Sequence, residues 1–207
     1  MKLPGYHLSR SRYEGVFVAK SYLKLQVITH VAVFLKPLKT LRIGRFMKVI
    51  GIDPGKKGCV VILDSIKGVA SWLNMPFRPD GILDLTALND ALLPFSTAVI
   101  YLEKIHGRSG WGATSVFNFG VNYGQVLGWL FDKPHTLITP QKWQYVAHLG
   151  TSGESAKEKS YQAFIRLNPG SKVKKSHDGL VDAFHIARFG LYFHGVDFKD
   201  GWDFKPI

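Results

Sequence analysis

The amino-acid sequence predicts a mixed α/β fold in which helices cover both faces of one sheet. Apolar runs typical of strands lie at 48–53 and 58–64, on either side of the turn Pro54-Gly55. Beyond residue 80, further apolar runs alternate with segments whose apolar residues recur at helical spacing. The chain has 207 residues, of which 46% are hydrophobic, so it is long enough to bury a sizeable core as one domain.

Three strands are predicted at the start of this domain. Their sequences are KVIGID at 48–53, GCVVILD at 58–64 and GVASWLNMP at 68–76. The short turns between them predict an antiparallel meander. Cys59 lies in the second strand, and because it is the only cysteine it excludes an intrachain disulfide and is interpreted as a small core residue.

The remaining elements alternate between helices and strands. A helix is predicted over 80–95 with Asp80 as its N-cap, followed by a central strand over 97–105 that ends near Glu103. The later elements are a helix over 113–131, a strand over 135–140, and helices over 140–149, 152–167 (capped by Ser152 or Ser155) and 176–193. The sheet would therefore be five-stranded and mixed, with three antiparallel strands and then parallel ones. The tail from Gly195 is expected to lie on the surface.

Positive charge is concentrated near the N-terminus. The formal net charge is +12, and residues 1–46 hold nine Lys and Arg against one acid, Glu14. We expect the domain to start at Met47, after a basic segment that is an upstream extension of the reading frame, a targeting peptide or an arm that touches nucleic acid. The longest apolar run of this segment, VITHVAVFL, is too short to span a bilayer. The charge favours an anionic partner such as nucleic acid.

Four carboxylates occupy positions that point to metal chemistry. Asp53 and Glu103 each stand where an apolar strand ends, and a carboxylate there is costly to desolvate unless a cation compensates it. Asp178 and Asp182 are four residues apart, so they share one face of the last helix. If the two strands are neighbours and the helix packs across their ends, the carboxylates converge on a site suited to Mg²⁺ or Mn²⁺.

Each acid also has a purely structural explanation. Asp53 could begin an Asp-Pro-Gly turn, and Glu103 could pair with a neighbouring basic residue. Asp178 could cap the helix, and Asp182 could be a solvated helix position. The last explanation is the weakest, because the residues that flank Asp182 in sequence are almost all apolar.

Four blocks of sequence resemble the RuvC-type Holliday junction resolvases, which belong to the RNase H-like, retroviral-integrase-type nuclease superfamily. The blocks are IGIDPGKKG, YLEKI, SVFNFGVNYGQVLG and HDGLVDAFHIARFG, and they occur in the family's order between Met47 and Tyr192. The last block is similar to the phage-encoded branch. The resemblance implies an RNase H-like fold, a crossover junction endodeoxyribonuclease activity and two Mg²⁺ ions, for which Mn²⁺ can substitute.

The resemblance also implies roles for the four acids, as catalytic residues and metal ligands. Asp53 matches the family's first-strand aspartate, Glu103 the glutamate at the end of the fourth strand, and Asp182 the acid of the last helix. Asp178 matches the acid one turn earlier. Bacterial members place that acid three residues before the last one, where this chain has Gly179.

The helix predicted over 113–131 carries Gly120, Gly124 and Gly128 along one face. Glycine at this spacing permits close approach of a backbone, either another helix or nucleic acid, and tight packing within the monomer is the alternative. In the family this helix is similar to one at the dimer interface, so the resemblance implies a homodimer. A symmetric dimer suits a four-way junction, which needs two symmetric cuts.

Candidate DNA contacts lie in the loop HGRSGWG, residues 106–112, and on basic residues further along the chain. His106 stands where the family has an aromatic residue, Arg108 could bind phosphate, and Trp111 could stack on a base. The lysines that could bind the phosphate backbone are Lys142, Lys157, Lys159, Lys174 and Lys175. Each of them could instead belong to a solvated face.

The sequence thus predicts a Mg²⁺-dependent, structure-selective endonuclease that resolves branched DNA by two-metal hydrolysis, with Asp178 or His177 completing the metal site. Two alternatives stay open: another RNase H-like nuclease that cuts RNA–DNA hybrids or single strands, and a non-catalytic DNA-binding module. An actin-like ATPase is excluded, because it needs a second phosphate loop and a much longer chain. We expect no membrane association and a location in the cytoplasm of a bacterium or phage-infected cell, with organellar targeting by residues 1–46 left open.

Overall fold

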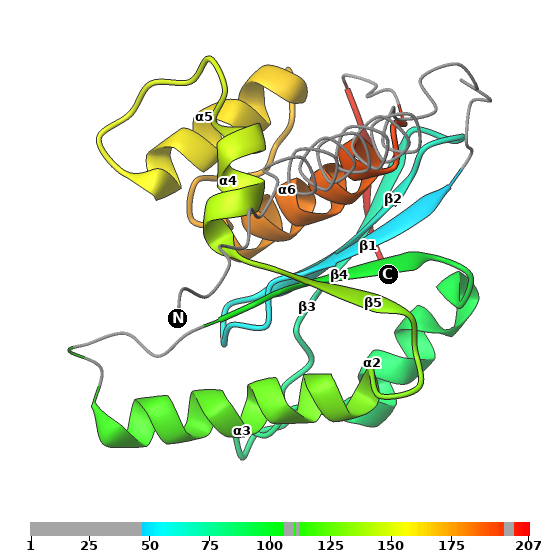
Figure 1. The fold of residues 1–207 in the computed structure, drawn as a ribbon, viewed down its shortest axis with the longest axis vertical. Coiled ribbons are helices and arrows are strands. Elements are labelled where there is room, and N and C mark those ends of the chain that lie inside the picture. Colours follow the sequence, from blue (N-terminus) through cyan, green and yellow to red (C-terminus); the bar gives the residue numbers. More distant parts are fainter. Residues whose placement is uncertain (1–46, 106–109, 111, 197–200) are drawn as a thin grey trace, which may run out of the picture. The chain divides into compact units, whose positions relative to one another are not determined.

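The computed structural model describes residues 47–105, 110, 112–196 and 201–207. The basic segment 1–46 and the predicted DNA contacts His106, Arg108 and Trp111 lie outside these residues. The described part forms a mixed sheet of six strands, in the order β5-β4-β1-β2-β3-β6, with helices on both faces (Figure 1). None of the described helices is long and apolar enough to cross a membrane.

Five of the six strands match the predicted layout. The meander consists of β1 (Lys48–Ile52), β2 (Cys59–Asp64) and β3 (Val69–Asn74), paired antiparallel. On the other side of β1 lie β4 (Val99–Glu103) and β5 (His135–Ile138), which both run parallel to it. The prediction of three antiparallel strands followed by parallel ones is confirmed.

The prediction of five strands is wrong by one. Most described residues of the tail are exposed, as expected, but Asp203–Pro206 forms a sixth strand, β6, which pairs parallel with β3 at the edge of the sheet. Aromatic packing explains the difference: the Phe204 ring lies 5.3 Å from that of Phe164 and 5.7 Å from that of Phe184. Trp202 beside it is only 8% exposed. The sequence of β6, DFKP, holds one large apolar residue and ends in a proline, so no strand pattern marks it.

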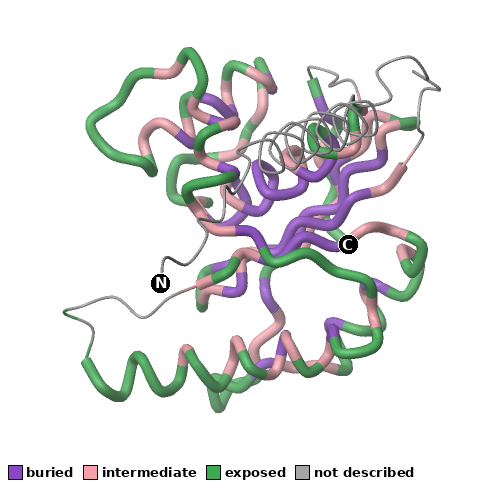
Figure 2. Tube along the Cα trace, in the orientation of Figure 1, coloured by how far each residue is buried: buried purple, intermediate pink, exposed green. Residues whose placement is uncertain are grey.

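The two faces of the sheet bury two separate apolar clusters, because successive strand residues point to opposite sides. On one side Val49, Val61 and Tyr101 pack with α4 (Pro140–Ala147), α5 (Ala156–Leu167) and α6 (Asp178–Phe193). On the other, Ile50 and Ile62 pack with α2 (Leu85–Leu92), the short helix η2 (Leu93–Phe95) and α3 (Ala113–Trp129). Figure 2 shows much of α6 buried and much of α3 exposed.

The N-cap residues of α2 and α5 differ in how they match the predicted caps. The N-cap of α2 is Asp84, whose side chain accepts a hydrogen bond from the Ala87 N–H, so Asp80 is not the cap. Asp80 instead lies in a turn, where it accepts from the Ile82 N–H and pairs with Arg78. Of the two serines proposed for α5, Ser155 caps it and accepts from the Glu158 N–H.

Candidate active site

The strands that carry Asp53 and Glu103 are direct neighbours. Strands β1 and β4 run parallel with Ile52 opposite Leu102, so Asp53 and Glu103 are the next residues of the two strands at the same sheet edge. Both side chains are partly buried. The strands that end at Asp53 and Glu103 are therefore neighbours, as the predicted meeting of the two carboxylates requires.

Glycines let α6 cross this sheet edge at very short range. A Cβ on Gly51 would lie 2.3 Å from the Ala183 carbonyl oxygen and 2.4 Å from the Ala187 nitrogen. Next to the N-terminus of α6, a Cβ on Gly179 would lie 2.0 Å from the Lys57 carbonyl oxygen. These contacts hold the first turns of α6, which carry Asp178 and Asp182, against the end of β1 and the turn that follows it.

The contact at Gly179 explains why this position carries no acid. A side chain at 179 would collide with the backbone at Lys57 and Gly58, so the position three residues before Asp182 has no room for an acid. Residue 178 begins α6 and is partly exposed, so a carboxylate fits there. His177, the alternative ligand, is the N-cap residue and is exposed.

Burial and mutual repulsion raise the pKa values of two of the acids. Burial raises the pKa of Asp53 to about 7, although its Oδ1 accepts a hydrogen bond from the Gly55 N–H at 3.0 Å. Burial also raises the pKa of Asp182 well above its usual value, and the charges of the other three acids raise it further. A hydrogen bond from the Ser160 side chain opposes that rise. Asp53 and Asp182 are therefore each within range of the negative charge of the other acids.

Two of the acids have strong partners of their own. Glu103 Oε1 accepts a hydrogen bond from Trp143 Nε1 at 2.9 Å. Asp178 Oδ2 lies 2.7 Å from Lys157 Nζ, an ion pair that joins α6 to α5. The sequence did not single out Trp143 as part of the site, because a tryptophan in an amphipathic helix is ordinarily a core residue.

Carboxylate oxygens are suitable ligands for a divalent cation. They are hard oxygen donors, and burial leaves their repulsion poorly screened, so a cation would lower the free energy of the ionised set. They are not a ready-made ligand set: across the described ranges, no three His, Cys, Asp or Glu side chains form a group that could hold a metal ion.

The five predicted phosphate-binding lysines lie on α4, α5 and the segment before α6. Lys142 and Lys174 are exposed, and Lys159 is partly buried. Lys157 pairs with Asp178, as described above, and Lys175 pairs with Glu158. Two of the five lysines therefore already hold a carboxylate.

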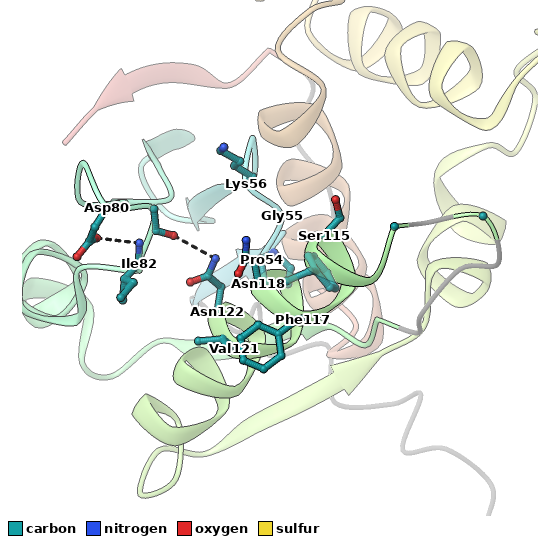
Figure 3. Close-up of a pocket in the computed structure, with 14 residues that line it drawn as sticks. Pro54, Gly55, Lys56, Asp80, Ile82, Ser115, Phe117, Asn118, Val121 and Asn122 are labelled. Carbon is teal, nitrogen blue, oxygen red and sulfur yellow. Dashed lines mark hydrogen bonds between the residues drawn. The ribbon is translucent and has the colours of Figure 1, made fainter.

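A cavity of about 900 Å³ opens beside the turn that follows Asp53 (Figure 3). Its lining includes Gly55 and Lys56 of that turn, and Phe117, Asn118 and Asn122 of α3. Phe117 is 69% exposed, and the Asn122 side chain donates to the Gly81 carbonyl at 3.4 Å. The sequence did not single out these α3 residues, because the glycine spacing of the helix indicates a packing face.

The glycine face of α3 is open. A Cβ on Gly120, Gly124 or Gly128 would meet no atom within 4 Å in the part of the chain that the structure describes. Tight packing within the monomer, one of the explanations for these glycines, is therefore wrong for the described residues.

No protein-family model matches the sequence, and no curated protein matches it. Solved structures similar to this chain include Thermus thermophilus RuvC in complex with a Holliday junction substrate (17% identity, TM-score 0.49) and T. thermophilus RuvC (22% identity, TM-score 0.49). These cover 72% of this chain and 97% and 98% of theirs. A Fowlpox virus resolvase bound to Holliday junction DNA has 14% identity and a TM-score of 0.40, and covers 72% of this chain and 99% of its own. Similarity at this level does not indicate a function for this chain.

Proposed function

We propose that this chain is a divalent-metal-dependent endonuclease of the RNase H-like superfamily that resolves four-way junctions or other branched DNA. The observation that carries the proposal is that Asp53 and Glu103 end two neighbouring parallel strands, and that α6, which carries Asp178 and Asp182, packs against the end of β1 and the turn after it. A fold gains nothing in stability from repelling carboxylates at one place, so their presence there favours a catalytic or metal-binding use. The resemblance of the sequence blocks supports the choice of junction DNA and of the phage-encoded branch.

The acids Asp53, Glu103, Asp178 and Asp182 would hold two Mg²⁺ ions, with Mn²⁺ as a substitute. These ions would supply Lewis-acid activation of water and neutralise the leaving oxygen during phosphodiester hydrolysis. The protein's own part is to present ionised carboxylates. Because the pKa of Asp53 is about 7, this side chain is largely protonated below neutral pH and must lose a proton before it can bind a cation.

DNA would approach over the basic residues around the acids. Lys142, Lys159 and Lys174 would contact the phosphate backbone, which carries no sequence information but positions the strand. Lys157 and Lys175 would do so only after exchanging their present carboxylate partners for phosphate. Phe117, exposed in the cavity lined by the turn residues Gly55 and Lys56, offers an aromatic surface for an unstacked base.

The open glycine face of α3 supports a homodimer. Glycines at every fourth position allow two helix backbones to approach closely, and the exposed Val116 and Val121 add apolar area on the same helix. A two-fold axis through this helix would present two active sites to a junction that has two-fold symmetry itself.

The test is cleavage by the purified full chain of a labelled four-way junction, a linear duplex of the same arms and an RNA–DNA hybrid, each with Mg²⁺ or EDTA. We expect paired symmetric nicks in the junction with Mg²⁺ only. Asp53→Asn should abolish them, whereas Asp90→Asn, an exposed acid on α2, should not.

Other outcomes assign the alternatives. Equal cutting of the hybrid would identify the sister nuclease and overturn junction selectivity. Junction binding without cleavage in Mg²⁺ or Mn²⁺ would identify a DNA-binding module. Cleavage that survives Asp53→Asn would remove the acids from the mechanism.

A further inference from the structure

A buried polar cluster lies behind the acids, where α4, α5 and α6 meet. Its members are Trp143 and His148 around α4, Ser160 on α5 and His185 on α6. Trp143 and His185 are each 1% exposed and Ser160 is 2% exposed. Buried polar groups cost free energy unless they are paired, so a cluster of them favours a functional role over a purely structural one.

The indole of Trp143 is directed at Glu103. Its Nε1–H is a donor with no acceptor capacity, and it gives its hydrogen bond to Glu103 Oε1 at 2.9 Å. The backbone brings the two residues together, because Ile138 of β5 lies opposite Glu103 and α4 starts two residues later at Pro140. A hydrogen bond to an ionised carboxylate is stronger than one between neutral groups.

Neighbouring rings fix the indole in place. His185 stacks on it, with ring centroids 6.2 Å apart and an angle of 9° between the planes, and His148 meets it edge-on at 6.3 Å. His185 Nε2 lies 2.9 Å from the Ser160 carbonyl oxygen, and because a carbonyl only accepts, Nε2 carries the hydrogen. Burial lowers the pKa of His185 to about 3, so the ring stays neutral at ordinary pH.

The same cluster reaches a second acid. The Ser160 hydroxyl lies 2.9 Å from His148 Nε2 and also hydrogen-bonds to Asp182. When Asp182 is ionised the hydroxyl donates to it, so His148 is then the donor to Ser160. Backbone and side chain of Ser160 thus tie the support of Trp143 to that of Asp182.

We propose that Trp143 is a positioning residue, whose buried indole N–H sets the orientation of the Glu103 carboxylate and thereby the divalent-cation affinity of the site. This inference rests on the proposed function. Partners that orient metal ligands typically change metal affinity 10- to 100-fold when they are removed. Trp143 is suited to this role because the rings of His185 and His148 pack against its indole and hold the donor in place.

The first test observes the hydrogen bond without metal. The chain has five tryptophans, and the indole N–H signal of Trp143 in an ¹⁵N-labelled full chain is assigned by its loss in Trp143→Phe. Glu103→Gln replaces the charged acceptor by a neutral one, so we expect the Trp143 indole proton to shift upfield more than any other indole proton. An unmoved Trp143 signal would overturn the proposal.

The second test measures Mn²⁺ affinity of the full chain by calorimetry and by electron paramagnetic resonance, in the absence of DNA. We expect Trp143→Phe to bind Mn²⁺ about 10-fold more weakly than the unchanged chain. The matched control is Trp202→Phe, since Trp202 belongs to the same apolar cluster and is not bonded to any of the four acids. Its affinity should stay within about twofold. If Trp143→Phe does not fold, benzothienylalanine at 143 keeps the ring size and replaces the N–H by sulfur.

The outcomes separate this proposal from the proposed function. Equal Mn²⁺ affinities in the Trp143 and Trp202 variants, with cleavage of the junction by the unchanged chain, would overturn the role of Trp143 alone. An unchanged chain that neither binds Mn²⁺ nor cleaves the junction would overturn the proposed function and this role with it.

Discussion

Glycine serves opposite purposes on the two faces of the sheet. On the α6 face, a Cβ on Gly51 would come within 2.3 Å of the helix backbone, and a Cβ on Gly190 would come within 2.6 Å of Val49 Cγ1. On α3, the three glycines at every fourth position meet nothing within 4 Å among the described residues. Figure 2 shows the same contrast, with α6 mostly buried and α3 mostly exposed.

The glycines at the α6 face are required for packing among the described residues of the monomer, whereas those of α3 are not. The glycines at the α6 face bring the helix backbone onto the strands, and this approach carries Asp182 to the strand ends. The α3 glycines weaken their helix by about 1 kcal/mol each relative to alanine, with no packing gain in the monomer. We therefore expect something outside the monomer to use the α3 face, as the proposed homodimer would.

The largest effect that tests this contrast is expected from Gly51→Ala. The added methyl group would overlap the α6 backbone, which cannot rotate away as a side chain would, so α6 must shift. We expect a loss of about 3 kcal/mol or more in the free energy of unfolding, measured by urea denaturation. Unfolding at the same urea concentration as the unchanged chain would show that α6 does not pack as described.

On the α6 face, the next largest effect is expected from Asp53→Asn, which should change how stability depends on pH. The pKa of Asp53 is about 7 in the folded chain against 3.8 as its ordinary value, so the folded state binds more protons between these pH values. The free energy of unfolding therefore falls as pH rises from about 4 to 7 and stays low above that. Asparagine carries no titratable proton, so this fall in the free energy of unfolding is absent in the variant. In EDTA, the variant should melt about 2–8 °C above the unchanged chain at pH 8, and by less at pH 5.

The matched substitution Asp90→Asn should change the melting temperature at neither pH, because Asp90 is exposed on α2. A variant Asp53→Asn that is less stable than the unchanged chain at both pH values would mean that Asp53 is not strained by burial and neighbouring charges.

The third prediction tests the α3 side with Gly124→Ala. Alanine is the better helix former and has open space here, so the monomer should gain about 0.5–1 kcal/mol of stability. The same methyl group should weaken self-association, measured by sedimentation over a range of concentrations. A destabilised monomer would mean that the glycine face packs within the chain after all.

The smallest effect is expected from Lys157→Met. The ion pair with Asp178 is solvent-accessible, with 55% and 33% of the two side chains exposed, so its loss should cost about 1 kcal/mol or less. The cost should shrink at high salt, measured by urea unfolding at two ionic strengths. Lys142→Met, at an exposed position of α4, is the control, and a large salt-independent loss for Lys157→Met would show that the pair is structurally essential.

Local pattern accounts for what could be predicted. Apolar runs located β1 and β4, and so placed Asp53 and Glu103 at strand ends, while helical spacing located α6 with its two acids. Pattern failed where an element depends on a distant partner. The strand β6 has one large apolar residue, Phe204, and ends in a proline, so it shows no strand pattern. Asp80 resembles a cap as closely as Asp84 does until the path of the chain is known.

The succession of strands and helices and the acids at their ends could be predicted from the sequence, because side-chain periodicity depends on a few neighbouring residues. Only the folded chain shows that β1 lies next to β4, that Gly179 leaves no room for an acid, and that Trp143 donates to Glu103. These facts depend on which backbones touch, and contacts between residues tens of positions apart leave no regular mark on a single sequence.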